Sequence, residues 1–183
     1  MNGVTMIKFH TVIAVLISIF MLSVAAQAFE DEDLQKLKSE KACNDCDLKN
    51  VELSKMSFTN ADLEETNFKE AVLSDLDLSG SNLEDADFSG AKLTNVNFTG
   101  AKLKSANFEN SILLWVNFNG ANLDSAKFEE STMKGVSFKD ANLDDAEFDD
   151  ANKSLADFTG GLEMKDEPCG PGSFGECKQP EEN

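Results

Sequence analysis

The sequence lacks several residue types on which common chemistry depends. Its 183 residues include no arginine, no tyrosine, one tryptophan and one histidine, His10. Without arginine there is no bidentate guanidinium clamp for a phosphate. His10 lies in an N-terminal segment that we expect to be removed, so no histidine remains to activate a nucleophile or to bind a metal. We find no nucleophile–base pair and no metal motif, and we expect no catalytic residues, no metal and no cofactor.

Positive charge is also scarce. The chain has 34 acidic residues against 16 basic ones, which gives a formal charge of −18 at pH 7. Removing residues 1–28 removes one lysine and no acid, so the remaining chain carries −19. We expect no nucleic-acid partner for a chain of this charge.

Residues 1–28 have the pattern of a secretory signal peptide. Lys8 precedes an apolar run from Val12 to Val24, and Ala26-Gln27-Ala28 supplies a small-residue cleavage site. We expect cleavage before Phe29, with no stable membrane anchor afterwards. An uncleaved anchor is the alternative, but the run is short for a membrane span. No cysteine sits at the cleavage site, so a lipoprotein is not expected.

A five-residue repeat runs from Cys46 to Phe158. Its central positions, from 48 to 158 in steps of five, are Leu or Phe in 21 of 23 cases, with Met133 and Lys153 as the others. Two residues earlier the side chain is small, except at Met56 and Leu76. A spacing of two places both side chains on one face of an extended segment, and the next spacing of three requires a turn. The turn positions are rich in residues that tolerate positive φ: Gly80, Gly90, Gly100, Gly120, Asn60, Asn95, Asn110, Asp75, Asp85, Asp140 and Asp145.

This repeat resembles that of the pentapeptide-repeat family. The resemblance implies an all-β fold, a right-handed quadrilateral parallel β-helix with four repeats per coil, and both apolar residues inward. The 23 repeats then form just under six coils. Sorting the central residues in steps of twenty is consistent with four sides, because it gives four stacks that are each mainly of one residue type. They are Phe68, Phe88, Phe108, Phe128 and Phe148; Phe58, Phe98, Phe118, Phe138 and Phe158; Leu53, Leu73, Leu93 and Leu113; and Leu63, Leu83, Leu103, Leu123 and Leu143. Phe therefore faces Phe across a filled interior.

Both ends of such a rod need caps, because the outermost coils present open edges. Residues 29–45 predict an N-terminal cap with a short helix, since acids at 30–33 precede Leu34 and Leu37, which share a face. The repeat domain is predicted over residues 46–160. Residues 161–183 are predicted to form a C-terminal tail with a cysteine loop.

The four cysteines lie in two close pairs, Cys43 with Cys46 and Cys169 with Cys177. In an exported protein disulfides are the default, and pairing within each end of the rod is favoured. A redox C-x-x-C lacks its usual strand–helix context here, and a four-cysteine zinc site would need the tail to cross the rod. A C-x-x-C before the first repeat also resembles the start of bacterial family members, which favours a structural role.

Two exterior features are candidates for binding. The C-terminal coils are densely acidic, which suggests either a divalent-cation site or, more simply, a solvated face. Ile112, Leu114 and Trp115 are predicted to project outward beside one another, which makes them a candidate interaction patch. A tolerated apolar turn, or a surface covered by the C-terminal tail, is the alternative.

Three functions remain open. The first is an exported, non-catalytic scaffold that binds an unknown protein in the periplasm or outside the cell; the thylakoid lumen is an alternative compartment. The second follows from the resemblance, since some members are acidic DNA-mimicking rods that bind DNA gyrase. The predicted signal peptide counts against it, because gyrase is cytoplasmic. The third is an enzyme, for which no cleft-forming residues are recognised. The sequence does not predict an oligomeric state.

Overall fold

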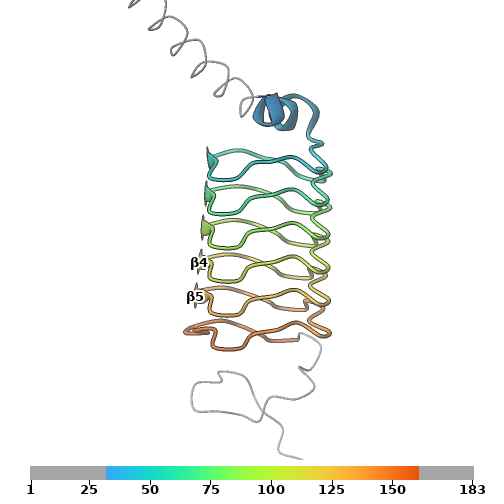
Figure 1. Cartoon of the computed structure of the whole chain (residues 1–183). Coiled ribbons are helices and arrows are strands. Elements are labelled where there is room, and N and C mark those ends of the chain that lie inside the picture. The colour runs from blue at the N-terminus through green and yellow to red at the C-terminus, as the bar shows by residue number, and fades with distance from the viewer. Residues whose placement is uncertain (1–31, 161–183) are drawn as a thin grey trace, which may run out of the picture.

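The computed structural model describes residues 32–160. The predicted signal peptide, its cleavage site and the Cys169 and Cys177 loop lie outside the described residues. Within them, a short helix of residues 32–40 is followed by a stack of coils (Figure 1). No helix in this part of the chain is long and apolar enough to cross a membrane.

One side of the stack is a five-stranded parallel sheet. Its strands, in spatial and sequence order, are β1 (Glu52–Ser54), β2 (Val72–Ser74), β3 (Lys92–Thr94), β4 (Ile112–Leu114) and β5 (Thr132–Lys134). Each residue pairs with the one twenty positions later, as Leu53 does with Leu73. Bridges on the other sides keep the same offset, for example between Asp62 and Asn82. The predicted parallel β-solenoid with four repeats per coil is therefore confirmed, while its handedness and the number of coils stay predictions.

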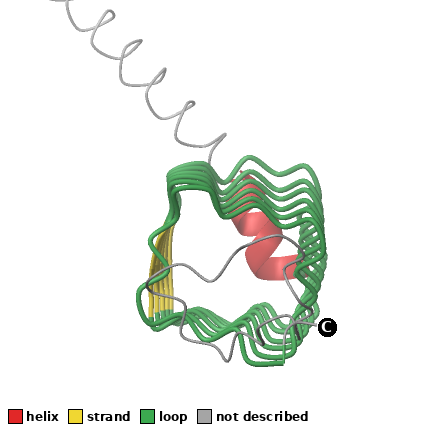
Figure 2. Cartoon of the chain, turned by 90° about the horizontal axis from the view of Figure 1, so that it is seen from below, coloured by secondary structure: helices red, strands yellow, loops and turns green. Residues whose placement is uncertain are grey.

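Every five-residue repeat ends in a corner with left-handed backbone. All positions from 45 to 160 in steps of five have positive φ, including each Gly, Asn and Asp that the sequence assigned to a turn. Four corners per coil give the four-sided outline seen along the rod (Figure 2). Trp115 (φ 57°) and Leu155 (φ 63°) also have this left-handed backbone, which large side chains rarely adopt. The stacked neighbours impose the conformation: the Trp115 N–H, for example, donates a 2.9 Å hydrogen bond to the Lys134 carbonyl.

The interior is filled by the predicted stacks. Phe108 is fully buried, and its ring centroid lies 4.8 Å from that of Phe88 and 4.9 Å from that of Phe128, with the planes nearly parallel. The second Phe stack meets the first edge-on, as Phe118 does with Phe108 at 5.5 Å. Offset-stacked and edge-to-face pairs are the arrangements that the ring quadrupole favours. The Leu columns are buried as well, so the filled interior that the sequence predicts is confirmed.

The first coil is covered by the helix, as the acidic and leucine pattern predicts. Leu37 is fully buried in the core, and Leu34 packs against it. The Asp47 N–H donates a 2.9 Å hydrogen bond to Oδ2 of Asp33, which joins the helix to the first coil. Cys43 and Cys46 form a disulfide beneath the helix, so the local pairing predicted for this pair is confirmed.

At the other end, Lys153 stands where the repeat calls for an apolar residue. Its side chain is half-buried, and its ammonium group lies 5.4 Å from the centroid of the Phe148 ring. Phe158, in the last described repeat, is also half-buried. The core thus becomes more accessible toward residue 160.

Candidate functional site

The four sides of the rod differ in their outward residues. In the coil of residues 101–120 the sides are 102–105, 107–110, 112–115 and 117–120, and each recurs in steps of twenty. We call the side that contains β1–β5, with residues 112–115 and their counterparts, the sheet side. The side of residues 102–105 lies opposite to it and is called the opposite side.

Negative charge is concentrated away from the sheet side. Among outward positions of residues 41–160, the opposite side has nine carboxylates and two lysines, and the side of residues 107–110 has nine and three. The side of residues 117–120 has three carboxylates and one lysine. On the sheet side the charged outward residues are Glu52, Asp75, Lys55, Lys92 and Lys134. It is the one side on which lysines outnumber acids, in a chain with a formal charge of −18.

Exposed apolar side chains gather on that same side. In the part of the chain that the structure describes, the exposed large hydrophobic residues are Val72, Ile112, Trp115 and Leu155, and all four occupy the sheet side or its corner. Leu114 beside them is half-buried. We call these five residues the sheet-side patch. The structure thus brings together the predicted Ile112, Leu114 and Trp115, all outward.

Val72 and Leu155 were missed by the sequence reasoning. Outward residues twenty positions apart stack in a column. Val72, Lys92 and Ile112 form one such column, and Trp115, Gly135 and Leu155 form another. Sorting outward positions in steps of twenty, as was done for the core, reveals both.

Trp115 is held in place by its own rod. Its indole lies across Gly135, so closely that a Cβ on Gly135 would fall 2.2 Å from Cε3 and 2.4 Å from Cζ3. One ring face therefore rests on the backbone of the following coil, while 59% of the side chain remains exposed. An aromatic group fixed in this way loses little side-chain entropy when a partner covers it.

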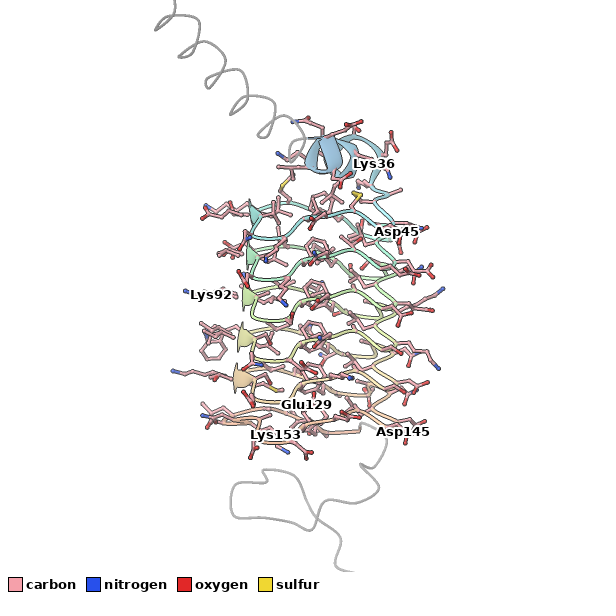
Figure 3. The ribbon with its side chains drawn as sticks, viewed as in Figure 1. Lys36, Asp45, Lys92, Glu129, Asp145 and Lys153 are labelled. Carbon is pink, nitrogen blue, oxygen red and sulfur yellow. A yellow bond between two sulfur atoms is a disulfide. The ribbon has the colours of Figure 1, made fainter. Side chains whose placement is uncertain are left out.

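Two lysines flank the apolar centre. Lys92 pairs in register with Ile112, and Lys134 pairs with Leu114, so each lies one coil away, at ~4.8 Å. Lys92 projects outward beside the strands in Figure 3. An ion pair lies on the opposite side, between Lys104 and Asp124, with 2.8 Å between Nζ and Oδ2.

The acidic coils contain closely approaching carboxyl groups. The pKa of Glu147 is raised above its ordinary value of 4.5, because its carboxyl hydrogen-bonds to Glu129 and because the Glu129 charge opposes its ionisation. Asp45 raises the pKa of Glu65 for the same two reasons. Figure 3 labels two of the acidic residues in the C-terminal coils, Glu129 and Asp145. Nowhere in residues 32–160 do three Asp, Glu, His or Cys residues form a group that could hold a metal ion.

Polar ladders account for many other outward residues. Asn67 donates to Asp47 at 2.9 Å, and Asn97 donates to Asp77 at 3.0 Å, each across one coil. These side-chain hydrogen bonds between neighbouring coils stabilise the stack. The ladder groups already bond to one another, which leaves the sheet-side patch as the candidate site.

The chain is similar to several solved structures, the first of which supports the fold. The pentapeptide repeat protein Rfr23 from the cyanobacterium Cyanothece 51142 is 24% identical, with a TM-score of 0.56, over 72% of this chain and 97% of that one. A pentapeptide repeat protein from the Arabidopsis thaliana thylakoid lumen is 23% identical, with a TM-score of 0.32, over 70% and 72% of the two chains. QnrB1, a plasmid-mediated fluoroquinolone resistance protein, is 20% identical, with a TM-score of 0.29, over 66% and 71%. No curated protein matches the sequence.

Family models match most of the solenoid. The model described as a pentapeptide repeat region matches residues 41–118, and the model described as pentapeptide repeats in eight copies matches residues 121–160. Together they span more than half of the chain and nearly all of the coils. The chain belongs to the pentapeptide repeat family.

Proposed function

We propose that this protein is an exported, non-catalytic scaffold that binds another protein through its sheet-side patch. The observation that carries the proposal is the coincidence of exposed apolar residues with the one side where lysines outnumber acids. Exposed aromatic and apolar side chains next to one another are typical of binding hot spots. The rest of the rod surface is either acidic or occupied by hydrogen-bonded polar ladders.

Two features favour a scaffold over an enzyme. The interior is filled with stacked Phe and Leu side chains, which provide a rigid core. The carboxylates project from the flat outer sides of the rod, whereas general acid–base chemistry needs two such groups held around a substrate. A rigid rod with a fixed surface is suited to binding.

Export is supported by the N-terminal pattern and by the disulfide. Residues 1–28 have the composition of a signal peptide, and the Cys43–Cys46 bond is of a kind that persists in oxidising compartments. We therefore place the protein in the periplasm or outside the cell, with the thylakoid lumen as the alternative. Intact mass after cell fractionation tests this: a chain that starts at Phe29 with oxidised cysteines supports export, and a cytoplasmic chain that retains Met1 contradicts it.

Binding through the sheet side can be tested by photo-cross-linking in the cells that produce the protein. A photoreactive residue at Thr94 lies on the sheet side, and one at Ser105 lies on the opposite side. We expect adducts with protein from Thr94 and none above background from Ser105. Adducts from Ser105 alone would contradict the proposal.

A DNA-mimicking rod is the second candidate, favoured by one observation. The two most acidic sides are adjacent, and each carries nine carboxylates, so they form a continuous negative surface. Such a surface could occupy the basic DNA groove of an enzyme such as DNA gyrase. Inhibition of gyrase supercoiling by the purified protein, together with a cytoplasmic location, would favour this candidate. We expect neither.

A further inference from the structure

We infer that the partner of the sheet-side patch is a second copy of this chain, so that the rods associate side by side through their sheet sides. This inference rests on the proposed function, since it names the partner of the same surface.

The sheet side is the side on which the outward charges of two copies repel each other least. Two rods brought together through the opposite side, or the side of residues 107–110, would each present nine carboxylates to the other. Side contact through the sheet side brings together two acids and three lysines from each copy. The opposite side then faces away from the partner, where the Debye length of ~8 Å at physiological salt screens most of the repulsion.

A two-fold axis through β4 also gives acceptable residue pairs. Ile112 and Leu114 of one copy then contact the same apolar strand of the other. Because a two-fold interface is isologous, the residues one coil away face each other as well. With parallel rods, Lys92 faces Thr94 of the second copy and Lys134 faces Thr132. With antiparallel rods, Lys92 faces Thr132 and Lys134 faces Thr94. Neither arrangement opposes two like charges.

The area predicts a weak association. Five coils at ~4.8 Å each and a side roughly 15 Å wide would bury roughly 700 Å² in total. Specific interfaces of standard size bury about 1,600 Å², so the sheet side is large enough only for a weak, transient contact. The indole of Trp115, already fixed on Gly135, reduces the entropy lost on association. We expect a dimer that dissociates in the micromolar range.

Sedimentation velocity of the full chain over a range of concentrations tests the inference. The weight-average mass should rise from one chain to two, and added salt should strengthen the dimer because it screens the like net charge. Ile112→Glu is the variant of choice. The stack already has a glutamate, Glu52, at the equivalent position of β1, so the fold should accept one on β4. This variant should weaken dimerisation by roughly tenfold or more, because a charge enters the apolar centre. The control Ser105→Asp adds the same charge on the opposite side. Asp85 occupies the same corner one coil earlier, and the variant should change the dimer dissociation constant less than about twofold.

The outcomes separate this inference from the proposed function. Trp115 is the sole tryptophan, and tyrosine is absent, so intrinsic fluorescence reports on the patch alone. A monomer at all concentrations with freely quenched Trp115 overturns the dimer and leaves the face open to a different partner. A monomer with shielded Trp115 means that the chain covers its own patch, which overturns both. A dimer that Ile112→Glu leaves intact uses another surface and also overturns the inference.

Discussion

The indole of Trp115 lies on Gly135 of the next coil, with no space for a side chain between them. The Trp115 side chain is therefore held in one position at its corner of the rod. The same corner column continues to the exposed Leu155. This contact between coils makes the patch a property of the stack and not of one repeat.

Gly135→Ala tests the contact. A Cβ at Gly135 would displace the indole, and the corner φ of 65° strains any alanine there. Because Trp115 is at the surface and can swing away, we expect a loss of about 1 kcal/mol from the backbone, with little more from the ring. Gly100→Ala is the matched control, since it has φ 65° and nothing within 4 Å of the added Cβ. Both variants should lose similar stability in denaturant titrations, but Gly135→Ala alone should lower the fluorescence anisotropy of Trp115.

Trp115→Asn separates folding from binding. Asn95 occupies the same corner one coil earlier with φ 55°, and Asn tolerates this conformation better than Trp does. The gain in backbone energy offsets the lost contact with Gly135, so the free energy of unfolding should change by less than about 1 kcal/mol. Dimerisation should nevertheless be lost in sedimentation. A variant that unfolds at room temperature would show that Trp115 has a structural role instead.

Phe108→Ala measures the contribution of the aromatic stack. Phe108 is fully buried between Phe88 and Phe128, so the substitution leaves a cavity and should cost about 3–5 kcal/mol. Phe158→Ala, at a half-buried position in the last described repeat, should cost clearly less. Equal losses in urea titrations of the two variants would contradict a core that becomes more accessible toward residue 160.

Glu147→Gln tests the repulsion within the acidic coils. The folded-state pKa of Glu147 is raised above 4.5, so its favourable contribution is complete below that pH and is lost as pH rises through the folded-state value. Glu147→Gln should therefore raise the melting temperature at pH 7 and have little effect at about pH 3. A lower melting temperature at pH 7 would show that the carboxylate stabilises the coil.

Asp157→Asn should show the opposite pH dependence. Thr159 donates hydrogen bonds to Asp157 from its hydroxyl and its N–H, which lowers the Asp157 pKa below 3.8. The stabilisation is present above that pH and is lost as pH falls through the folded-state value. The variant should melt earlier than wild type at pH 7, and the difference should shrink in acid. Melting curves across pH check both signs.

Much of the fold could be predicted from the sequence, because one period governs both local and long-range structure. The spacing of Leu63, Phe68 and Leu73 determines which side chains point inward, and the step of twenty then determines which of them stack. The positive φ at corners follows from Gly, Asn and Asp at the turn positions. A helix over the first coil follows from acids before Leu34 and Leu37.

The patch was predicted only in part, because exposure depends on neighbours one coil away. Trp115 could be recognised as outward from its phase, but its support by Gly135 requires the pairing of coils. Val72 and Leu155 look like ordinary deviations until they are placed in their columns. The proximity of Glu129 and Glu147 was missed for a similar reason: the two residues are eighteen positions apart, so they belong to neighbouring columns and not to one.

The accessibility of Trp115 in dilute full-length protein tests the central claim most directly, because a patch that the chain itself covers cannot bind a partner. The structure leaves 59% of this side chain exposed. We therefore predict red-shifted emission and efficient quenching by acrylamide at concentrations where the protein is monomeric, with Trp115→Asn as the blank. Blue-shifted emission and inefficient quenching in the monomer would contradict the assignment of the sheet side as the binding face.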